Sequence, residues 1–299
     1  MENVLTLIAN PAGPALCDDE VAIAWAALFE AGATVEEPEW LADELACDIS
    51  FSGFGPEVGD QAARQYLQDA PIDIVAQPRA GRRKLLLVAD MDSTTISVEC
   101  IDELADFAGL RAEVADITDR AMRGELDFER ALIERAALLA GLDVEFMATA
   151  FAERVRLTPG ARTLVRTMRA NGAYTALVSG GFTFFTSRVR RMVGFDIDRA
   201  NELVVADGRL TGAVREPILG PEAKLAALER LAGERGIQPN RTLAVGDGAN
   251  DIPMIQAAGL GVAFHAKPLV AAAAAARIDH GDLTALLYLQ GYRADEFAD

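Results

Sequence analysis

The sequence predicts an α/β protein built on a doubly wound parallel sheet, with an inserted helical cap and a small amino-terminal α+β domain. Strand-like and helical segments alternate from residue 85 onward, which is typical of a parallel sheet covered by helices. Between the first two of these strands the chain looks entirely helical, over far more residues than one crossover needs. The basic, glycine-containing stretch PRAGRRK at 78–84 changes the composition abruptly and is typical of a linker.

The amino-terminal domain is expected to cover residues 1–80. Apolar alternation and helical periodicity place its elements along the chain. They are strands at 3–8, 47–52 and 72–77 and helices at 18–31 and 56–69. This order indicates a small α+β unit that ends near Pro78.

The core of the main domain is expected to comprise residues 84–97 and 157–291, and the helical cap residues 98–156. Asp207-Gly208 lies between two β-prone runs and predicts a hairpin. The expected elements of the core are strands at 85–90, 173–179, 242–247 and 260–264, the hairpin at 201–216 and a helix in the alanine run 271–276.

Composition limits the classes of function. The 299 residues have room for roughly two domains, and 51% hydrophobic residues are ample for their cores. The formal charge of −18 disfavours nucleic acids and anionic membranes as partners, because both would be repelled, whereas a small anion needs only a local positive site. The start MENVLTLIAN does not match a signal peptide and no apolar run reaches transmembrane length, so we expect a cytoplasmic protein.

The cysteines and histidines give no sign of a metal or redox site. Cys17, Cys47 and Cys100 are an odd number without metal-like or redox-like spacing, and we expect them to be reduced and mostly buried. His265 and His280 lie far apart and have no histidine or cysteine neighbour at ligand spacing. We therefore expect both histidines to be structural or surface residues.

Two carboxylates follow an apolar strand in LLLVADMDSTTI, residues 85–96. In open parallel sheets, the polar groups that act on ligands gather beyond the carboxyl ends of the strands, where Asp90 lies. Asp92, two residues on, points the same way, so the pair can share a metal ion or divide the nucleophile and acid/base roles. With Thr94 they form the pattern Asp-x-Asp-x-Thr, which suggests phosphoryl transfer. An ordinary acidic turn after a strand is the alternative.

The second strand ends in Ser179-Gly180-Gly181, ahead of a probable helix that begins near Phe182. Glycines there let the backbone approach a ligand closely, and free amide groups at a helix start suit a phosphate. Alone the motif is weak, because it is also a common turn. Its position beside the carboxylates makes it useful.

The third strand leads into the glycine-rich loop GDGAND, which carries Asp247, Asn250 and Asp251. Carboxylate and carbonyl oxygens are the ligands of hard cations, and magnesium takes one or two carboxylates together with waters and substrate phosphate oxygens. Asp90, the backbone carbonyl of Asp92 and Asp247 make a plausible magnesium set. Calcium is the less favoured ion.

Two basic side chains occupy positions that stability alone does not explain. Lys224 follows Pro221 in the opening turns of a helix, where a cation opposes the helix dipole, and it falls on the apolar stripe of that helix. Arg135 interrupts the apolar stripe of DFERALIERAALLAGL in the cap. A phosphate partner would explain Lys224, and a substrate carboxylate would explain Arg135. A snorkelling surface lysine and an ion pair within the cap are the respective alternatives.

Glu99 stands just after the first motif, at the entrance to the cap. Its carboxylate could bind an ammonium group of a ligand. It could equally be a favourable acidic residue near a helix start.

Together these motifs resemble those of the haloacid dehalogenase-type phosphatases: DMDSTTI, LVSGGF, the lysine at 224 and VGDGANDIPM occur in order, with no departure at a motif position. The resemblance covers about residues 84–291. The cap run and its spacing resemble, more narrowly, the phosphoserine phosphatases of that superfamily. The resemblance implies a Rossmann-like core and magnesium-dependent hydrolysis of O-phospho-L-serine to L-serine and phosphate, the last step of serine biosynthesis.

The resemblance also implies a role for each matching residue. Asp90 would attack phosphorus and become an aspartyl phosphate, while Asp92 would protonate the leaving serine oxygen and later deprotonate the attacking water. Asp92 must then carry a proton at the right moment, so we expect its pKa to be raised by Asp90 and by cap closure. The other implied residues are Asp247 on magnesium with Asp90 and Asp92; Ser179, Gly180, Lys224 and Asn250 around the phosphate; Glu99 and Arg135 on the amino and carboxylate groups; Met122 and Phe128 along the pocket; and Thr94 and Asp251 in support.

Three questions stay open at this point. The enzyme could pass the phosphoryl group to a second alcohol such as homoserine instead of water. A non-catalytic amino-acid sensor with a vestigial phosphatase domain is another alternative, although the intact motifs oppose it. The element order of residues 1–80 could resemble a ferredoxin-like, amino-acid-binding regulatory module, but no motif supports this, and a scaffold role is the safer interpretation.

Overall fold

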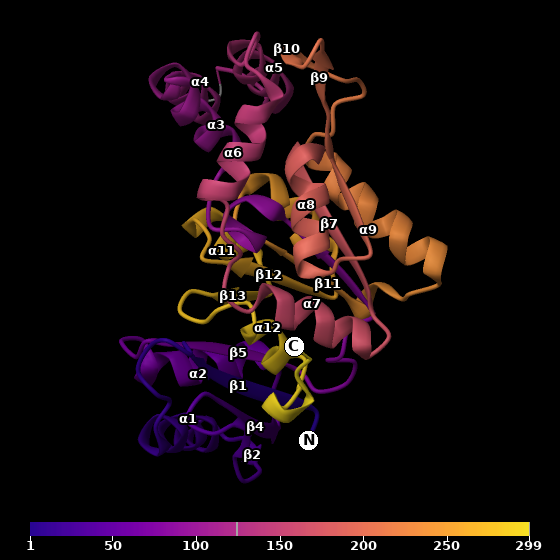
Figure 1. Ribbon diagram of the computed structural model, residues 1–299. Coiled ribbons are helices and arrows are strands. Elements are labelled where there is room, and N and C mark those ends of the chain that lie inside the picture. Colours follow the sequence, from indigo (N-terminus) through magenta and orange to yellow (C-terminus); the bar gives the residue numbers. More distant parts are fainter. Residues whose placement is uncertain (124, 299) are drawn as a thin grey trace.

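The computed structural model describes residues 1–123 and 125–298, which form three tiers (Figure 1). The amino-terminal unit lies at one end, the parallel sheet and its helices in the middle, and the helical cap at the other end. The carboxyl-terminal segment lies between the core and the amino-terminal unit, so both chain ends are in the same part of the molecule.

The amino-terminal unit is an antiparallel sheet in the order β2-β4-β1-β5, with β3 also pairing with β4. Its elements are β1 (Asn3–Ala9), α1 (Asp18–Glu30), β2 (Thr34–Val35), β3 (Glu39–Ala42), β4 (Ala46–Ser52), α2 (Pro56–Leu67) and β5 (Ile72–Pro78). The three longer strands and both helices were predicted; β2 and β3 are too short to carry a pattern. Without β3, the chain order is β-α-β-β-α-β, which is that of the ferredoxin-like arrangement.

Every residue of β1 is buried, because both faces of this sheet are covered. Leu5 and Leu7 pack into the cluster formed with α1 and α2. Ile8 and Val75 face the other way and belong to the main hydrophobic core of the molecule. The unit therefore packs against the core through its sheet.

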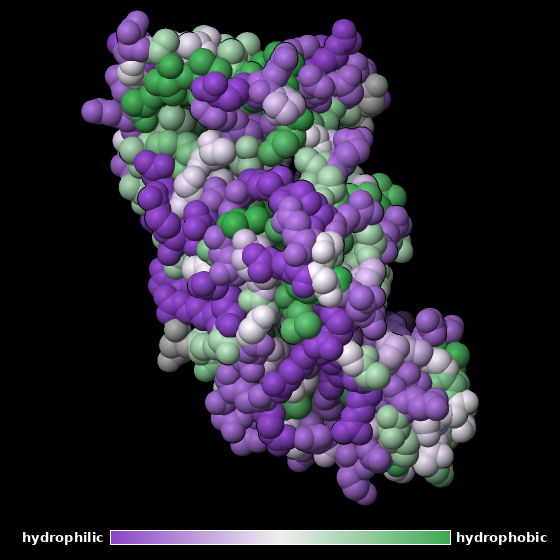
Figure 2. Space-filling view, turned by 90° about the vertical axis from the view of Figure 1, so that its right-hand side faces the viewer, coloured by the Kyte–Doolittle hydropathy of each residue, from purple (hydrophilic) through white to green (hydrophobic). Residues whose placement is uncertain are grey.

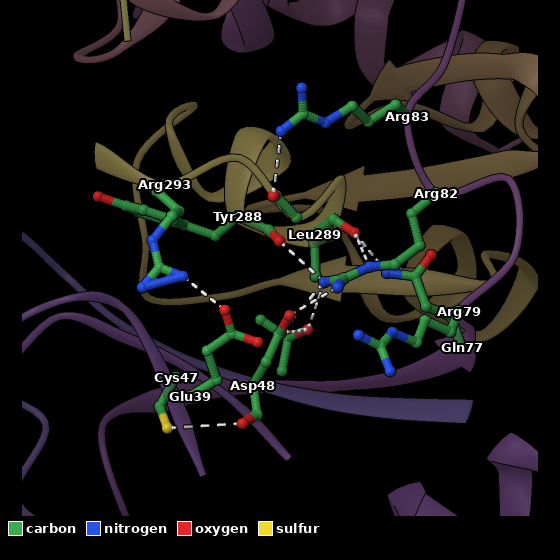
Figure 3. A network of polar contacts seen from close by, with 12 residues as sticks. Glu39, Cys47, Asp48, Gln77, Arg79, Arg82, Arg83, Tyr288, Leu289 and Arg293 are labelled. Carbon is green, nitrogen blue, oxygen red and sulfur yellow. Dashed lines mark hydrogen bonds and ion pairs between the residues drawn. The ribbon is translucent and has the colours of Figure 1, made fainter. Parts of the chain in front are cut away.

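Buried polar contacts reinforce this junction (Figure 3). Arg82, in the linker, pairs with Asp48 of β4 at 2.6 Å and donates to the backbone carbonyls of Tyr288 and Leu289. Asp73 of β5 accepts hydrogen bonds from three backbone amides of the core loop at 279–281. These contacts hold the unit on the core. If the two parts separated, the buried charges and amides would lose their partners.

The core is a six-stranded parallel sheet in the order β13-β12-β11-β6-β7-β8. Its strands are β6 (Leu86–Ala89), β7 (Tyr174–Phe182), β8 (Ile197–Asn201), β11 (Thr242–Gly246), β12 (Leu260–Phe264) and β13 (Ala276–Ile278). Helices cover both faces. Leu87 packs on the side of α7 (Ala161–Ala170) and α8 (Thr183–Val193). Leu86 packs on the side of α9 (Pro221–Arg235) and α10 (Ile252–Ala257). The doubly wound parallel sheet predicted from the sequence is confirmed.

Two edge strands and the alanine run differ from the prediction. β8 and β13 were not expected, because β8 is largely polar and β13 has only three residues. The helix expected at 271–276 is wrong in its second half: α11 (Pro268–Ala273) ends before it, and Ala276 begins β13, where it pairs with Val262. Pairing with the sheet thus overrides the helix propensity of alanine.

The core helices are α7 (Ala161–Ala170), α8 (Thr183–Val193), α9 (Pro221–Arg235), α10 (Ile252–Ala257), α11 (Pro268–Ala273) and α12 (Ala285–Leu289), with short turns η2 (Pro239–Arg241), η3 (Ala249–Asp251) and η4 (Ala294–Glu296). The cap consists of α3 (Cys100–Ala108), α4 (Arg111–Met122), α5 (Phe128–Leu138) and α6 (Val144–Arg154). Asp127 and Asp143 cap α5 and α6 by accepting hydrogen bonds from backbone amides.

The predicted hairpin, β9 (Leu203–Ala206) and β10 (Arg209–Val214), leaves the core and packs against the cap (Figure 1). Gly141 donates its amide to the carbonyl of Leu210 at 2.8 Å, and Leu210 donates to Leu142 at 2.8 Å. The cap is therefore built from two separate segments of the chain.

The visible surface is mostly hydrophilic in Figure 2, and the larger hydrophobic areas lie at the level of the cap. Within residues 1–123 and 125–298, no helix combines the length and apolar character needed to cross a membrane. Cys47 and Cys100 are buried, Cys17 is exposed, and all three are free thiols.

Candidate active site

Three of the predicted site residues are brought together by the strand order. β6 lies between β11 and β7, so Asp90 and Asp247, directly after their strands, and Ser179, in the last part of β7, meet at one edge of the sheet. The amide of Asp90 donates to the Val245 carbonyl at 3.0 Å and continues the pairing of β6 with β11. Thr94 donates its hydroxyl to Asp247 Oδ1 at 3.0 Å, which joins the first and third motifs.

The segment Met91–Thr95 turns irregularly after β6 and presents both carboxylates. Ser93 adopts a left-handed backbone conformation, with φ of 54°. The buried hydroxyl of Thr95 donates to the Asp90 carbonyl at 2.5 Å and holds the turn closed. Sequence reasoning did not single out Thr95, although its place directly after Thr94 was the available signal.

Lys224 lies between two buried carboxylates. Its Nζ is 2.8 Å from Asp90 Oδ1 and 2.5 Å from Asp251 Oδ1, and the side chain is only 2% exposed. Burial alone would lower the pKa of Lys224, but Asp90 and Asp251 outweigh it and raise the pKa above the usual value. The amine is therefore a charged, fixed group, and the surface-lysine alternative is excluded.

Asp251 is positioned by the glycines of its own loop. A Cβ on Gly246 would lie 2.3 Å from Asp251 Cγ, so a larger residue at this position would displace the Asp251 side chain. The amide of Gly248 donates to Asp251 Oδ2 at 3.1 Å. Burial and then Asp90 raise the pKa of Asp251 to about 7, against the lowering effect of Lys224.

Asp92 links the core to the cap. Its Oδ1 accepts from the amide of Cys100, the first residue of α3, at 3.0 Å, and its Oδ2 accepts from the Ser179 hydroxyl at 3.3 Å. Burial first, and the charge of Asp90 second, raise the pKa of Asp92 to about 6 despite these hydrogen bonds. The pKa is raised as expected, and burial is the larger cause.

The carboxylates can accommodate a metal ion. One oxygen each from Asp90, Asp247 and Asp251 lies within 4.8 Å of the others. Asp90 Oδ1 is buried, and no donor of the described residues makes a hydrogen bond to it. Its contact with Lys224 is an ion pair. Burial and Asp90 raise the pKa of Asp247. Three carboxylates, two of them paired with the single ammonium group of Lys224, suit an additional hard cation with oxygen ligands.

The glycine loop, residues 179–181, is the irregular last part of β7 and lies against Asp92. A Cβ on Gly181 would be 2.9 Å from Asp92 Oδ2, and the Gly181 amide donates to Ser179 Oγ at 2.9 Å. The carbonyl of Gly180 accepts from Asn201 Nδ2 at 2.9 Å. α8 then begins at Thr183 without a side-chain cap, which leaves first-turn amides available to an anion. Sequence reasoning missed Asn201, because it is a single polar residue at the end of an unpredicted strand.

The cap brings Phe128 onto this loop. Its ring is so close to Gly180 that a Cβ there would be 2.8 Å from Phe128 Cζ. Phe128 is thus part of the wall between cap and core. Met122 was expected beside it, but the side chain of Met122 falls outside the described part of the structure.

Arg135 forms no ion pair with any carboxylate of the described residues. Its Nε donates to the carbonyl of Ala131 at 3.2 Å. Burial lowers the pKa of Arg135, and Asp102, Glu99 and Asp92 are the negative charges that act against this. The ion pair within the cap that was the alternative is therefore absent for this residue.

Glu99 lies at the mouth of the site, where Ser93 donates its hydroxyl to Glu99 Oε1 at 2.8 Å. Glu99 is exposed to solvent on one side, but the protein around its carboxyl group displaces much of the water that would hydrate it. This loss of hydration, followed by the charge of Asp92, raises the pKa of Glu99 to about 8. The carboxyl thus lies in a region of excess negative charge that favours a bound cation or ammonium group.

Asn250 lies in η3, between the metal-suited carboxylates, and is partly buried. Its amide oxygen packs over Gly248, where a Cβ would come within 2.3 Å of it. Asn250 is therefore close to the site, with its amide group held against the loop.

Comparisons with known proteins indicate one family. The chain matches the haloacid dehalogenase-like hydrolase family over residues 85–259. A phosphoserine phosphatase of Streptomyces coelicolor is 40% identical over 298 residues, which is 98% of this chain and 72% of that protein.

Solved structures indicate the same family. A probable phosphoserine phosphatase of Vibrio cholerae has a TM-score of 0.79 and 30% identity, over 99% of this chain and 88% of that one. Phosphoserine phosphatase structures described as substrate-bound and as a phospho-aspartyl intermediate analogue have TM-scores of 0.64 and 41% identity, over 69% of this chain and 98% of theirs. The chain belongs to the haloacid dehalogenase-like hydrolases and, within them, to the phosphoserine phosphatase family.

Proposed function

We propose that this protein hydrolyses O-phospho-L-serine to L-serine and phosphate through an aspartyl phosphate on Asp90. The observation that carries the proposal is the pairing of two unlike carboxyl groups. Asp90 contacts the buried ammonium group of Lys224 at 2.8 Å, whereas Asp92 has a pKa raised to about 6. One carboxylate can then act as the nucleophile while its neighbour carries a proton.

In the first displacement, a carboxylate oxygen of Asp90 attacks phosphorus and the bond from phosphorus to the serine oxygen breaks. Asp92 gives its proton to that oxygen, so that serine leaves as an alcohol. Lys224 places a positive charge beside Asp90 and offsets its repulsion from the phosphate group.

In the second displacement, the ionised Asp92 takes a proton from water, and the resulting hydroxide attacks the phosphorus of the aspartyl phosphate. The bond from phosphorus to Asp90 breaks, and phosphate leaves. Both carboxyl groups are then in their starting states. The covalent intermediate divides a barrier that direct attack by water crosses very slowly.

We propose magnesium as the ion that the carboxylates of this site would hold. In the proposal Asp90, Asp247 and the backbone carbonyl of Asp92 hold it, and Thr94 orients Asp247 through its hydroxyl. When bound, the ion supplies positive charge that stabilises the phosphate oxygens during transfer. Lys224 and Asp251 hold the acidic side chains in place through their own ion pair.

The cap supplies recognition of the amino acid. Arg135, without an ion-pair partner among the described residues, is suited to a carboxylate because of its planar fork of donors. Glu99, in a region of negative charge, is suited to an ammonium group. Phe128 closes the pocket over Gly180, and Ser179, Gly180 and Asn250 surround the phosphate. This assignment makes phosphoserine the substrate class that matches both cap charges. The cytoplasmic location stays a prediction.

The test is phosphate release in magnesium-containing buffer from phosphoserine, phosphothreonine and sugar phosphates. We expect phosphoserine to have the highest kcat/KM by a wide margin. Equal rates on sugar phosphates would contradict the assignment of the cap charges. If water is the acceptor, adding an alcohol such as homoserine should give no phosphorylated alcohol among the products.

A further inference from the structure

A groove of about 500 Å³ lies between the amino-terminal sheet and the carboxyl-terminal segment. Five arginines line it: Arg79, Arg82, Arg83, Arg241 and Arg293. Only three carboxylates share the lining, so the groove has a formal excess of two positive charges in a chain of net charge −18. Such a local reversal of charge is a physical reason to expect an anion there.

Three of the arginines are neutralised by carboxylates of the groove, and Figure 3 shows two of these pairs, Arg82 with Asp48 and Arg293 with Glu39. Each pair joins two different parts of the chain. The pairs are Arg82 with Asp48 at 2.6 Å, Arg83 with Glu296 at 2.6 Å and Arg293 with Glu39 at 2.5 Å. These contacts form the walls of the groove and are part of the junction between the two units.

Arg241 and Arg79 are not neutralised in this way. Arg241 donates from Nε to the Arg83 carbonyl at 2.9 Å, and no carboxylate within residues 1–123 and 125–298 lies within 4.0 Å of its guanidinium group. Among the carboxylates of the described residues, Arg79 pairs with Glu36 alone, at 3.8 Å, and both side chains are 50% exposed, which makes the contact weak. Two guanidinium groups therefore keep donors available on the groove.

The neighbouring Lys84 indicates the same excess of positive charge. Its buried amine donates to the Asn240 carbonyl at 2.8 Å and has no carboxylate partner in the described chain. Burial first, and Arg241 second, lower the pKa of Lys84 to about 8. A second cation beside Arg241 thus strengthens the attraction for an anion.

We propose that this groove binds a small dianion, a dicarboxylate or a phosphate-like oxyanion, through Arg79 and Arg241. The guanidinium fork matches both chemistries, and the volume lies in the range of small-molecule sites. The anion would neutralise the two excess charges and join the linker, which carries Arg79, to the start of β11, which follows Arg241. The groove contains none of the residues assigned to phosphoserine hydrolysis, so this inference stands apart from the proposed function.

The experiment is calorimetric titration of the full chain with malonate and with sulfate, with acetate as a monoanionic reference at equal ionic strength. We expect saturable one-site binding of at least one dianion. The double variant Arg79→Gln, Arg241→Gln should weaken it by roughly tenfold or more, as expected for the loss of charge-assisted hydrogen bonds. Arg199→Gln, an exposed arginine of β8 that does not line the groove, is the matched control and should bind as the wild type does.

Two results would overturn the proposal. Binding that survives the double substitution belongs to another site, including the catalytic one, and equal weakening by Arg199→Gln indicates net charge rather than a groove. Absence of saturable binding to the wild type refutes the proposal directly. Arg79→Gln alone, whose side chain is half-exposed, serves if the double variant does not fold. Phosphate release from phosphoserine should be unchanged in all three variants.

Discussion

Asn201 donates its side-chain amide to the carbonyl of Gly180 at 2.9 Å and so ties the base of the hairpin to the glycine loop of the candidate active site. The same amide donates to the Leu219 carbonyl at 3.2 Å, and its oxygen accepts from the Leu219 backbone at 2.7 Å. Asn201 is buried, and these contacts satisfy its side chain. One residue thus holds the glycine loop and the segment that leads to Lys224.

Asn201→Asp should impair the site, because a carboxylate oxygen would replace the amide nitrogen that donates to the carbonyls of Gly180 and Leu219. We expect kcat/KM for phosphoserine to fall by about tenfold or more, and inhibition by phosphate to weaken in parallel, because the loop loses its fixed position. Steady-state kinetics with phosphate as inhibitor measure both. Asn171→Asp, which alters a comparable amide contact to Thr167 in α7, is the control. Equal effects of both substitutions would reduce the role of Asn201 to stability.

Asp90→Asn should abolish phosphoenzyme formation, with activity lower by several orders of magnitude, on the order of a thousandfold or more, because an amide is a poor nucleophile. Asp92→Asn retains the nucleophile and should still form some phosphoenzyme that is slow to hydrolyse. Acid-quenched reactions with labelled phosphoserine, followed by mass spectrometry of the peptide 85–96, distinguish the two. An active Asp90→Asn enzyme would refute the assignment of the nucleophile.

Arg135→Ala should raise the KM for phosphoserine by about tenfold to a hundredfold, since a charged hydrogen bond to the substrate carboxylate is lost. The KM for phosphoethanolamine, which has no carboxylate, should change little. Arg130→Ala, an exposed arginine of the same helix, is the matched control. A similar rise for both substrates would remove the argument for carboxylate recognition.

Gly181→Ala should lower kcat, because the added methyl group would lie 2.9 Å from Asp92 Oδ2. It would displace Asp92, the proposed general acid. Gly233→Ala is the contrast. Gly233 lies inside α9 with nothing near its position, so alanine there should stabilise the fold by roughly 0.5–1 kcal/mol without changing kcat. Kinetics and denaturant unfolding of the two variants test the pair; unchanged kcat in Gly181→Ala would show that the contact has no catalytic consequence.

Lys84 should make stability depend on pH in the alkaline range. Its pKa in the fold is lowered to about 8 from the ordinary value of 10.5, so the unfolded chain binds more protons between these values. The free energy of unfolding should therefore rise with pH through this window relative to Lys84→Met, by up to roughly 3 kcal/mol. Urea unfolding of both proteins from pH 7 to pH 10.5 measures the difference. A constant difference across this range would contradict the lowered pKa.

The sequence predicted the parts of the site that lie on strong local patterns. Asp90, Ser179 and Asp247 follow apolar strands, and the parallel order of β11, β6 and β7 then brings them together. Lys224 stood out because a cation was placed on an apolar stripe. These patterns need no knowledge of distant contacts.

The remaining features depend on contacts between distant segments. Asn201 acquires its role only through Gly180 and Leu219, which no spacing in the sequence indicates. The end of the alanine run became a strand because β12 offered an edge to pair with. The arginine groove likewise forms from residues near 80, 241 and 293, which meet only in the folded chain.

The sheet of the amino-terminal unit contributes Ile8, Leu41, Ala46 and Val75 to the same apolar cluster that contains the core helices. The unit also has a cluster of its own, but it cannot unfold separately without exposing these shared residues, and the core residues that they cover, to water. Heating or denaturant should therefore unfold residues 1–80 and the catalytic core in a single cooperative transition. Removal of the first 80 residues would then weaken the enzyme thermodynamically, even though none of the residues proposed for hydrolysis lies there.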